Sequence, residues 1–173
     1  MLQISKLIAK GAGLAPVLLK RAASVELDWD LRQKSRFEAI DSSGRQLGVF
    51  LARGCVVRGG DVLVAEDGSL IRVIAAPQAV LRIEHCTEHG TPFDLIRAAY
   101  HLGNRHVPIE LKPKHLQIEP DHVLEDLLRA MHLIVHRIEA AFEPESGAYA
   151  SGTFASGVHA DEHAHDHGHS HHH

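Results

Sequence analysis

The sequence predicts an α+β protein in which a small all-β domain precedes a second domain of the order β-α-β-β-α-β. After residue 25, short segments alternate between apolar and polar residues, and turn residues separate them at even spacing. Beyond Ala75-Ala76-Pro77, strand patterns alternate with two amphipathic helix patterns. From about Ser146 the composition is mostly Ala, Ser, Gly and His, which cannot bury a core. We therefore expect an N-terminal domain (1–76), a second domain (77–147) and a disordered histidine-rich tail (148–173).

The N-terminal domain is expected to contain five short strands. The first contains Leu27, Trp29 and Leu31, which alternate with polar residues as in a half-buried strand. The other four are predicted at residues 36–40, 47–51, 62–65 and 70–74. Turns rich in Gly, Ser and Asp connect them. Five strands at this spacing indicate a small sandwich or barrel, and the absence of histidine before residue 85 indicates a scaffold or docking module.

The second domain combines strands with two capped helices. A strand is predicted at 78–86, and a helix follows from the N-cap Thr91 to about Leu102, with Gly103 just past its end. Its expected buried positions are Phe93, Leu95, Ile96, Ala99 and Tyr100. Two short strands (107–111 and 115–118) precede a second helix, which is capped by Asp121 and carries apolar residues at Val123, Leu124, Leu127, Leu128 and Met131. A last strand at 137–142 completes the split βαβ, ferredoxin-like order.

The composition argues against several classes of protein. The 173 residues are 45% hydrophobic and 23% charged, as in ordinary globular proteins. No apolar run approaches the ~18 residues of a membrane span, and Lys6 and Lys10 interrupt any signal-peptide core, so we expect no membrane partner. Two cysteines are too few for a disulfide framework and fit a reducing cytoplasm. A net charge of −4 offers no basic surface for nucleic acid. No phosphate loop, nucleophile elbow or His-Glu-x-x-His motif occurs, so we do not expect an enzyme.

Histidine is the feature that points to metal binding. All 16 histidines lie from His85 onward, and eight of them fall in the last fifteen residues. In the tail, imidazoles alternate with other residues, and neutral imidazole is a suitable ligand for Ni, Zn and Cu. The candidate ligands there are His163, His165, His167, His169 and His171. A purification tag is the alternative, although Ala, Asp, Gly and Ser interleave with these histidines and only the final three residues form a continuous run.

Two further candidate ligands lie in the second domain. His106 follows the predicted helix end at Gly103-Asn104, where Asn can adopt a left-handed turn, and it precedes a strand, so it is held at a rigid corner. His122 follows the cap Asp121, where the helix dipole favours neutral imidazole. An ordinary surface or core histidine is the alternative at both positions.

Other histidines and the cysteines are expected to be ordinary residues. The cluster His85-Cys86-Thr-Glu-His89 has no second ligand pair, which makes it a weak zinc signal. His132 and His136 are four residues apart, but the second helix is expected to end between them. Cys55 and Cys86 are interpreted as small buried hydrophobic residues.

Four stretches together resemble the UreE urease accessory protein family, which comprises cytosolic nickel metallochaperones. They are Tyr100-His-Leu-Gly-Asn-Arg-His-Val-Pro108, the run that begins Asp121-His-Val-Leu, Phe142-Glu-Pro-Glu-Ser-Gly-Ala-Tyr149 and the histidine-rich tail. The similarity extends into the first half through residues 28–36 and the Arg53-Gly54 … Gly59-Gly60-Asp61-Val62-Leu63 stretch. It covers the chain from about residue 25 to the end.

The resemblance implies an N-terminal docking or peptide-binding domain and a ferredoxin-like metal-binding domain that forms homodimers. His106 from both subunits would then share one metal ion, His122 would be a further ligand, and the tail would bind additional ions. The resemblance also implies that the protein delivers Ni(II) to apo-urease, with the GTPase UreG as the partner that receives the ion. Zn(II), Cu(II) or Co(II) could compete with Ni(II) for the ligands. Two departures stand out: Pro120 replaces a histidine of some relatives, and His132 replaces a glycine near the helix end.

Two other functions compete with nickel delivery. A metal-storage or detoxification protein would act through its tail alone. A metallohydrolase would use His106 and His122 as ligands and would need a carboxylate ligand and a general base. The candidates for these two roles are Asp121 and Glu125, and both are expected on the helix surface.

Overall fold

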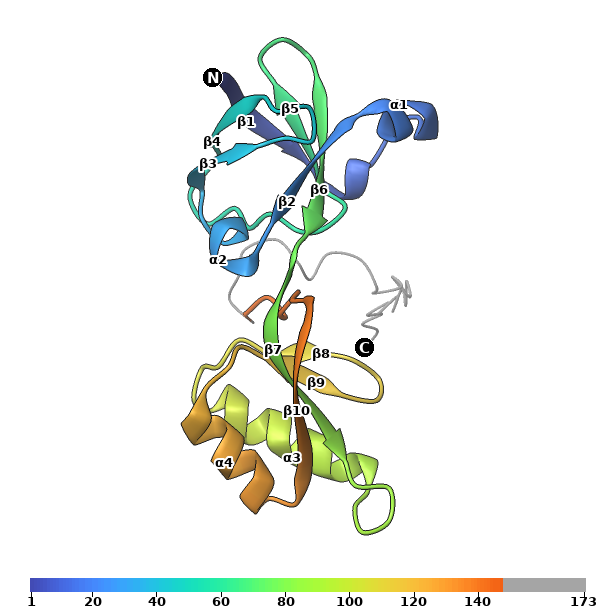
Figure 1. Cartoon of the computed structure of the whole chain (residues 1–173), viewed down its shortest axis with the longest axis vertical. Helices are drawn as coiled ribbons and strands as arrows, with labels where there is room; N and C mark the ends of the chain where they lie inside the picture. Colours follow the sequence, from blue (N-terminus) through green and yellow to red (C-terminus); the bar gives the residue numbers. More distant parts are fainter. Residues whose placement is uncertain (148–173) are drawn as a thin grey trace, which may run out of the picture.

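The computed structural model describes residues 1–147, which form two sheets joined end to end (Figure 1). The first sheet has six strands in the order β2-β6-β5-β1-β4-β3. Its strands are β1 (Leu2–Ile8), β2 (Ala23–Leu27), β3 (Arg36–Ile40), β4 (Gln46–Phe50), β5 (Val62–Ala65) and β6 (Leu70–Ala75). Ser42 at the end of the β3 edge donates its backbone N–H to the carbonyl of Ser24 on β2 at 2.7 Å, so the two edges of the sheet approach each other as in a barrel.

Two features of this strand-rich domain differ from the sequence prediction. β1 was not predicted, and it pairs parallel with β4 and antiparallel with β5 in the middle of the sheet. The predicted strand through Trp29 and Leu31 is wrong beyond Leu27. The Asp28 side chain accepts the backbone N–H of Leu31 at 2.9 Å, and this cap starts the short helix α2 (Trp29–Arg32) instead. A 3-10 turn η1 (Ala9–Gly11) and an exposed helix α1 (Pro16–Arg21) complete this half.

The second sheet has four antiparallel strands in the order β10-β7-β9-β8. Its strands are β7 (Pro77–His85), β8 (Glu110–Leu111), β9 (Leu116–Ile118) and β10 (Leu133–Ala141). Helices α3 (Pro92–Gly103) and α4 (His122–Ala130) cover one face, where they pack on Leu81, Ile83 and Ile118 (Figure 1). The predicted β-α-β-β-α-β order is therefore confirmed. Within the described residues, no helix is long and apolar enough to cross a membrane.

The apolar stripe of α3 is wider than the core beneath it. Leu95, Ala98 and Leu102 are buried against the sheet. Phe93, Ile96 and Tyr100 were predicted to be buried but are 58%, 63% and 66% exposed. Helical periodicity identified the apolar residues correctly, but a single sheet covers only one side of the helix. On α4, Leu128 is buried as predicted and Val123 is exposed.

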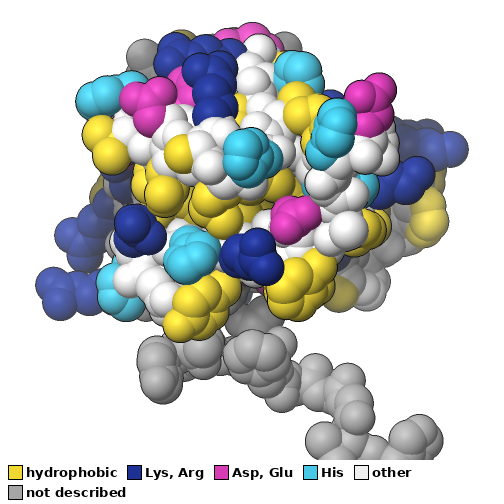
Figure 2. Space-filling view, turned by 90° about the horizontal axis from the view of Figure 1, so that it is seen from below, with side chains coloured by type: hydrophobic (Ala, Val, Ile, Leu, Met, Phe, Trp, Pro, Cys, Tyr) yellow, Lys and Arg dark blue, Asp and Glu magenta, His cyan; other side chains and the backbone are white. Residues whose placement is uncertain are grey.

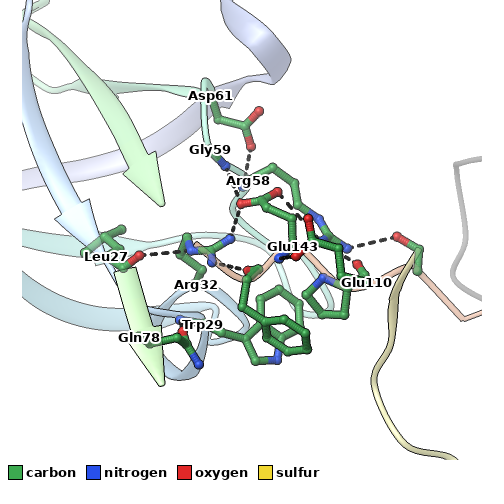
Figure 3. A network of polar contacts seen from close by, with 12 residues as sticks. Leu27, Trp29, Arg32, Arg58, Gly59, Asp61, Gln78, Glu110 and Glu143 are labelled. Atoms are coloured by element: carbon green, nitrogen blue, oxygen red, sulfur yellow. Dashed lines mark hydrogen bonds and ion pairs between the residues drawn. The ribbon is translucent and has the colours of Figure 1, made fainter. Parts of the chain in front are cut away.

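A buried polar network joins the two sheets (Figure 3). Arg32 of α2 is completely buried and donates to the carbonyls of Leu27 and Phe142 and to the carboxylate of Glu143. The Glu143 carboxylate also accepts the N–H of Gly59, at 3.0 Å. The segment that follows β10 is thereby fastened to the N-terminal sheet, next to the edge-to-face pair of Trp29 and Phe142.

Candidate metal site

His106 lies in the connection that leads from the end of α3 to β8. Thr91 caps the start of the helix, as the sequence predicted, and Asp94 completes a capping box in which its carboxylate accepts the Thr91 N–H at 2.7 Å. At the other end, the N–H of Val107 returns to the carbonyl of Leu102 at 3.2 Å, which closes the turn around His106. The imidazole is therefore exposed on a hydrogen-bonded corner.

The left-handed residue of this turn is His106 itself. Its φ is 57°, whereas Asn104 has φ −62° and Gly103 belongs to the helix. The expectation that Gly103 follows the helix end and that Asn104 could take the left-handed turn is therefore wrong. A non-glycine residue in this region is uncommon, although histidine is among the more tolerated types. Such backbone conformations are frequent at functional sites, which supports a functional role for the His106 side chain.

Exposed apolar residues lie on the helix that leads to His106. Phe93, Ile96 and Tyr100 follow one another at helical spacing on α3. We call these three residues the α3 stripe. Beside it, a groove of about 810 Å³ runs between α3 and the β8–β9 connection, and Ile96, Leu111 and Pro113 contribute to its lining. Seen from the end of the molecule formed by the second domain, apolar side chains gather among several histidines (Figure 2).

His122 is the first residue of α4 and is exposed. The Asp121 side chain accepts the N–H of Leu124 at 3.0 Å, so the predicted cap is present and its carboxylate is engaged. Among residues 1–147, no group of three or more His, Cys, Asp or Glu side chains is arranged to hold a metal ion. Neither His106 nor His122 therefore belongs to such a group within the described chain, and His163, His165, His167, His169 and His171 lie outside the described residues.

Glu125 is not the surface residue that its sequence position suggested. It is 3% exposed, and its carboxylate pairs with Arg129 at 2.7 Å and accepts the Nε–H of Arg137 at 3.0 Å. The hydrogen bond from Arg137 lowers the pKa of Glu125, and both arginine charges act in the same direction although burial opposes them. A carboxylate held between two guanidinium groups is unsuited to act as a general base, which weakens the metallohydrolase alternative.

The remaining histidines divide into two groups. α4 ends at Ala130, so His132 and His136 do not share a helix face; His132 has φ 62°, and His136 is exposed on β10. By contrast, the loop after β7 brings Cys86 Sγ within 3.7 Å of His89 Nδ1. Hydrogen bonds to Cys86, first from the His89 ring and then from backbone N–H groups of His89 and Glu88, lower the pKa of this thiol. The sequence analysis named this cluster but set it aside as a weak zinc signal, and it interpreted Cys86 as a buried hydrophobic residue, whereas the structure leaves Cys86 half-buried.

The comparisons with known proteins cover both halves of the chain. Residues 4–76 match the family model for the UreE urease accessory protein, N-terminal domain, and residues 78–173 match that for its C-terminal domain. "Urease accessory protein UreE" of Paracidovorax citrulli is 78% identical over 152 residues, which are 88% of this chain and 72% of the relative. The proteins of that name from Polaromonas sp. and Cupriavidus necator are 76% and 48% identical over 152 residues, 88% of this chain and 69% and 77% of the relatives.

These matches agree with the motifs around His106, His122 and Phe142 that first suggested the family. They also agree with a strand-rich N-terminal domain followed by an α/β domain. The chain belongs to the UreE urease accessory protein family.

Proposed function

We propose that this protein is a cytoplasmic carrier that binds Ni(II) and delivers it for assembly of the urease active site. The observation that carries the proposal is the position of His106, an exposed imidazole fixed on a left-handed corner at the end of the α3 stripe. A single imidazole cannot hold an ion tightly. The ion therefore needs further ligands from beyond the immediate surroundings of His106, since His106 belongs to no group of three or more potential ligands among residues 1–147.

A second copy of the chain supplies the simplest additional ligand. A two-fold interface duplicates each residue, so His106 from both protomers can face one ion. The α3 stripe would be buried in such a homodimer, which gives these exposed apolar residues a partner of matching chemistry. Two imidazoles from two protomers leave positions open around Ni(II), and a partly open coordination sphere suits a protein that must release its cargo.

His122 and the tail are the sources of the remaining ligands in this proposal. The ~16 residues from Ala148 to His163 span at most ~50 Å when extended, which is long relative to a domain of this size. Imidazole also binds Zn(II), Cu(II) and Co(II), and these ions are the expected competitors. The proposed recipients are apo-urease and the GTPase UreG, with the histidine-free N-terminal domain as the docking module.

Nickel titration by calorimetry, together with mass determination, tests the site. Four proteins are compared: the full chain, His106→Ala, a chain that ends at Tyr149, and His136→Ala as a control for an exposed histidine outside the site. We expect the shortened chain and the control to keep one tight Ni(II) per dimer, and His106→Ala to lose at least tenfold in affinity for that ion.

The alternative is a storage protein in which the tail is the only metal site. In that case the chain ending at Tyr149 binds no nickel and His106→Ala binds as much as the full chain. This result would overturn the carrier site at His106.

A further inference from the structure

The loop between β7 and α3 holds a cysteine and a histidine side by side. The N–H of Gly90 donates to the carbonyl of Cys86 at 2.8 Å, which closes the segment into a single tight turn. A Cβ at position 90 would lie 2.9 Å from that carbonyl oxygen, so only glycine fits there. The turn brings Cys86 Sγ to 3.7 Å from His89 Nδ1.

This separation equals that of two ligands on one metal ion. Zinc lies about 2.3 Å from a thiolate sulfur and about 2.0–2.1 Å from an imidazole nitrogen, so a tetrahedral angle places the two ligand atoms about 3.6 Å apart. Two ligands separated by two residues are also a usual spacing for one half of a zinc site. The pair needs little rearrangement to accept an ion, because the turn already sets the distance.

The surroundings leave room for further ligands. His89 is exposed and Cys86 is half-buried, so solvent reaches the pair. His85 lies at the end of β7, and its Nδ1 is 3.3 Å from the Cys86 carbonyl oxygen. The coordination positions of a bound ion that Cys86 and His89 do not fill are therefore open to water or to another ligand.

We propose that Cys86 and His89 form a second metal site, separate from His106, for a thiophilic ion of the Zn(II) class. On metal binding the S–H bond of Cys86 breaks and its proton goes to solvent, while the thiolate sulfur and the His89 imidazole nitrogen replace two water molecules on the ion, with no change of oxidation state. A thiolate favours softer ions than the imidazole ligands proposed for nickel. The site would thus bind zinc-like ions at a place other than the nickel position, and it does not depend on the nickel proposal.

Cobalt(II) titration of the full chain under a thiol-free reductant tests this site. A sulfur-to-cobalt charge-transfer band in the near ultraviolet arises only from thiolate ligation, so histidine sites in the same protein are silent. We expect a band whose final intensity corresponds to one thiolate-bound Co(II) per chain, and which Zn(II) abolishes when it is added in excess of all the histidine sites. Cys86→Ser should remove it, and His89→Ala should weaken Co(II) binding at least tenfold.

Two variants serve as controls. Cys55→Ser replaces the other cysteine, which packs against the N-terminal core, and it should leave the band unchanged. His106→Ala should also keep the band, which separates this site from the nickel proposal. Absence of a band in the full chain, or a band that survives Cys86→Ser, would overturn the site.

Discussion

His106 and His132 share an uncommon backbone conformation but differ in their surroundings. Both have positive φ, 57° and 62°, and both side chains are exposed. The imidazole of His106 is the proposed nickel ligand, so the strained backbone at this residue serves to position that ligand. His132 follows α4, where its N–H donates to the carbonyl of Arg129 at 2.9 Å, and the structure assigns no contact to its side chain that requires histidine. This is the position at which glycine usually ends a helix.

His132→Gly is expected to stabilise the protein by about 0.5–1 kcal/mol. The left-handed conformation costs an L-residue roughly 1–2 kcal/mol, and the greater freedom of glycine in the unfolded chain offsets part of the gain. Urea denaturation measures the change in the free energy of unfolding. His136→Gly is the matched control on the exposed face of β10, where glycine should destabilise by about 0.5–1 kcal/mol. Equal effects of the two variants would contradict the conformational argument.

At the scale of the element, α3 has one face buried against the sheet of its own domain and another face exposed. Its caps and its buried face fix the helix on the sheet, and the α3 stripe faces outward. Helical periodicity predicted which residues are apolar, but it could not divide them between the core of one chain and a surface that a second chain would cover.

In the homodimer proposed above, Ile96→Glu is expected to weaken the association of the two chains at least tenfold, with little effect on the stability of the monomer. Ile96 is largely exposed in one chain, so the charge stays solvated until a partner would bury it. Sedimentation or light scattering at several concentrations measures the dimer. Val17→Glu, on the exposed helix α1, is the matched control and should leave the dimer intact. A variant at Ile96 that dimerises like the parent would exclude the α3 stripe from the interface.

At the scale of the whole molecule, the network around Arg32 couples the two sheets. The same segment that Arg32 holds also touches the connection from His106, because Glu143 donates its N–H to Glu110 at 3.0 Å and Glu145 donates its N–H to Ile109 at 2.8 Å. Residues 142–146 therefore contact both the N-terminal domain and the connection that follows His106.

Arg32→Leu is expected to destabilise the protein by about 3 kcal/mol. The change removes a fully buried cation, deprives the Phe142 carbonyl of its donor and takes one of the donors from both the Glu143 carboxylate and the Leu27 carbonyl. Denaturation followed by the fluorescence of Trp29, which lies in the network, measures this loss. Arg36→Leu, at an exposed position of β3, should change stability by less than 0.5 kcal/mol. A loss at Arg32 as small as that at Arg36 would show that the network contributes little.

Acid should loosen the same region. Burial by itself would raise the pKa of Glu110, but the hydrogen bonds from Lys112, the Glu143 N–H and Gln117 outweigh it and lower the pKa. A lowered pKa gives a stabilising contribution that is complete above the ordinary glutamate pKa of about 4.3 and is lost as the pH falls through the lower value in the folded protein. Stability measured from pH 6 to pH 3 should therefore fall less steeply in Glu110→Gln than in the parent. Identical slopes would contradict this role.

The sequence determined the local features of this protein. Caps at Thr91 and Asp121, apolar periodicity and turn residues predicted the order of the second domain, and the motifs around His106 and His122 predicted the family. Each of these signals depends on a few neighbouring residues, so it can be recognised in the sequence alone. Prediction from local sequence failed where two signals competed. After Leu27, the helix cap at Asp28 outweighed the alternating pattern that predicted a strand.

The tertiary structure decided what depends on residues far apart in the chain. It placed β1 between β4 and β5 and buried Glu125 of α4 against Arg137 of β10. It also joined Arg32 to Glu143, 111 residues away. Strand pairing, burial and ion pairing depend on which surfaces meet after the chain has folded, and no local pattern contains that information.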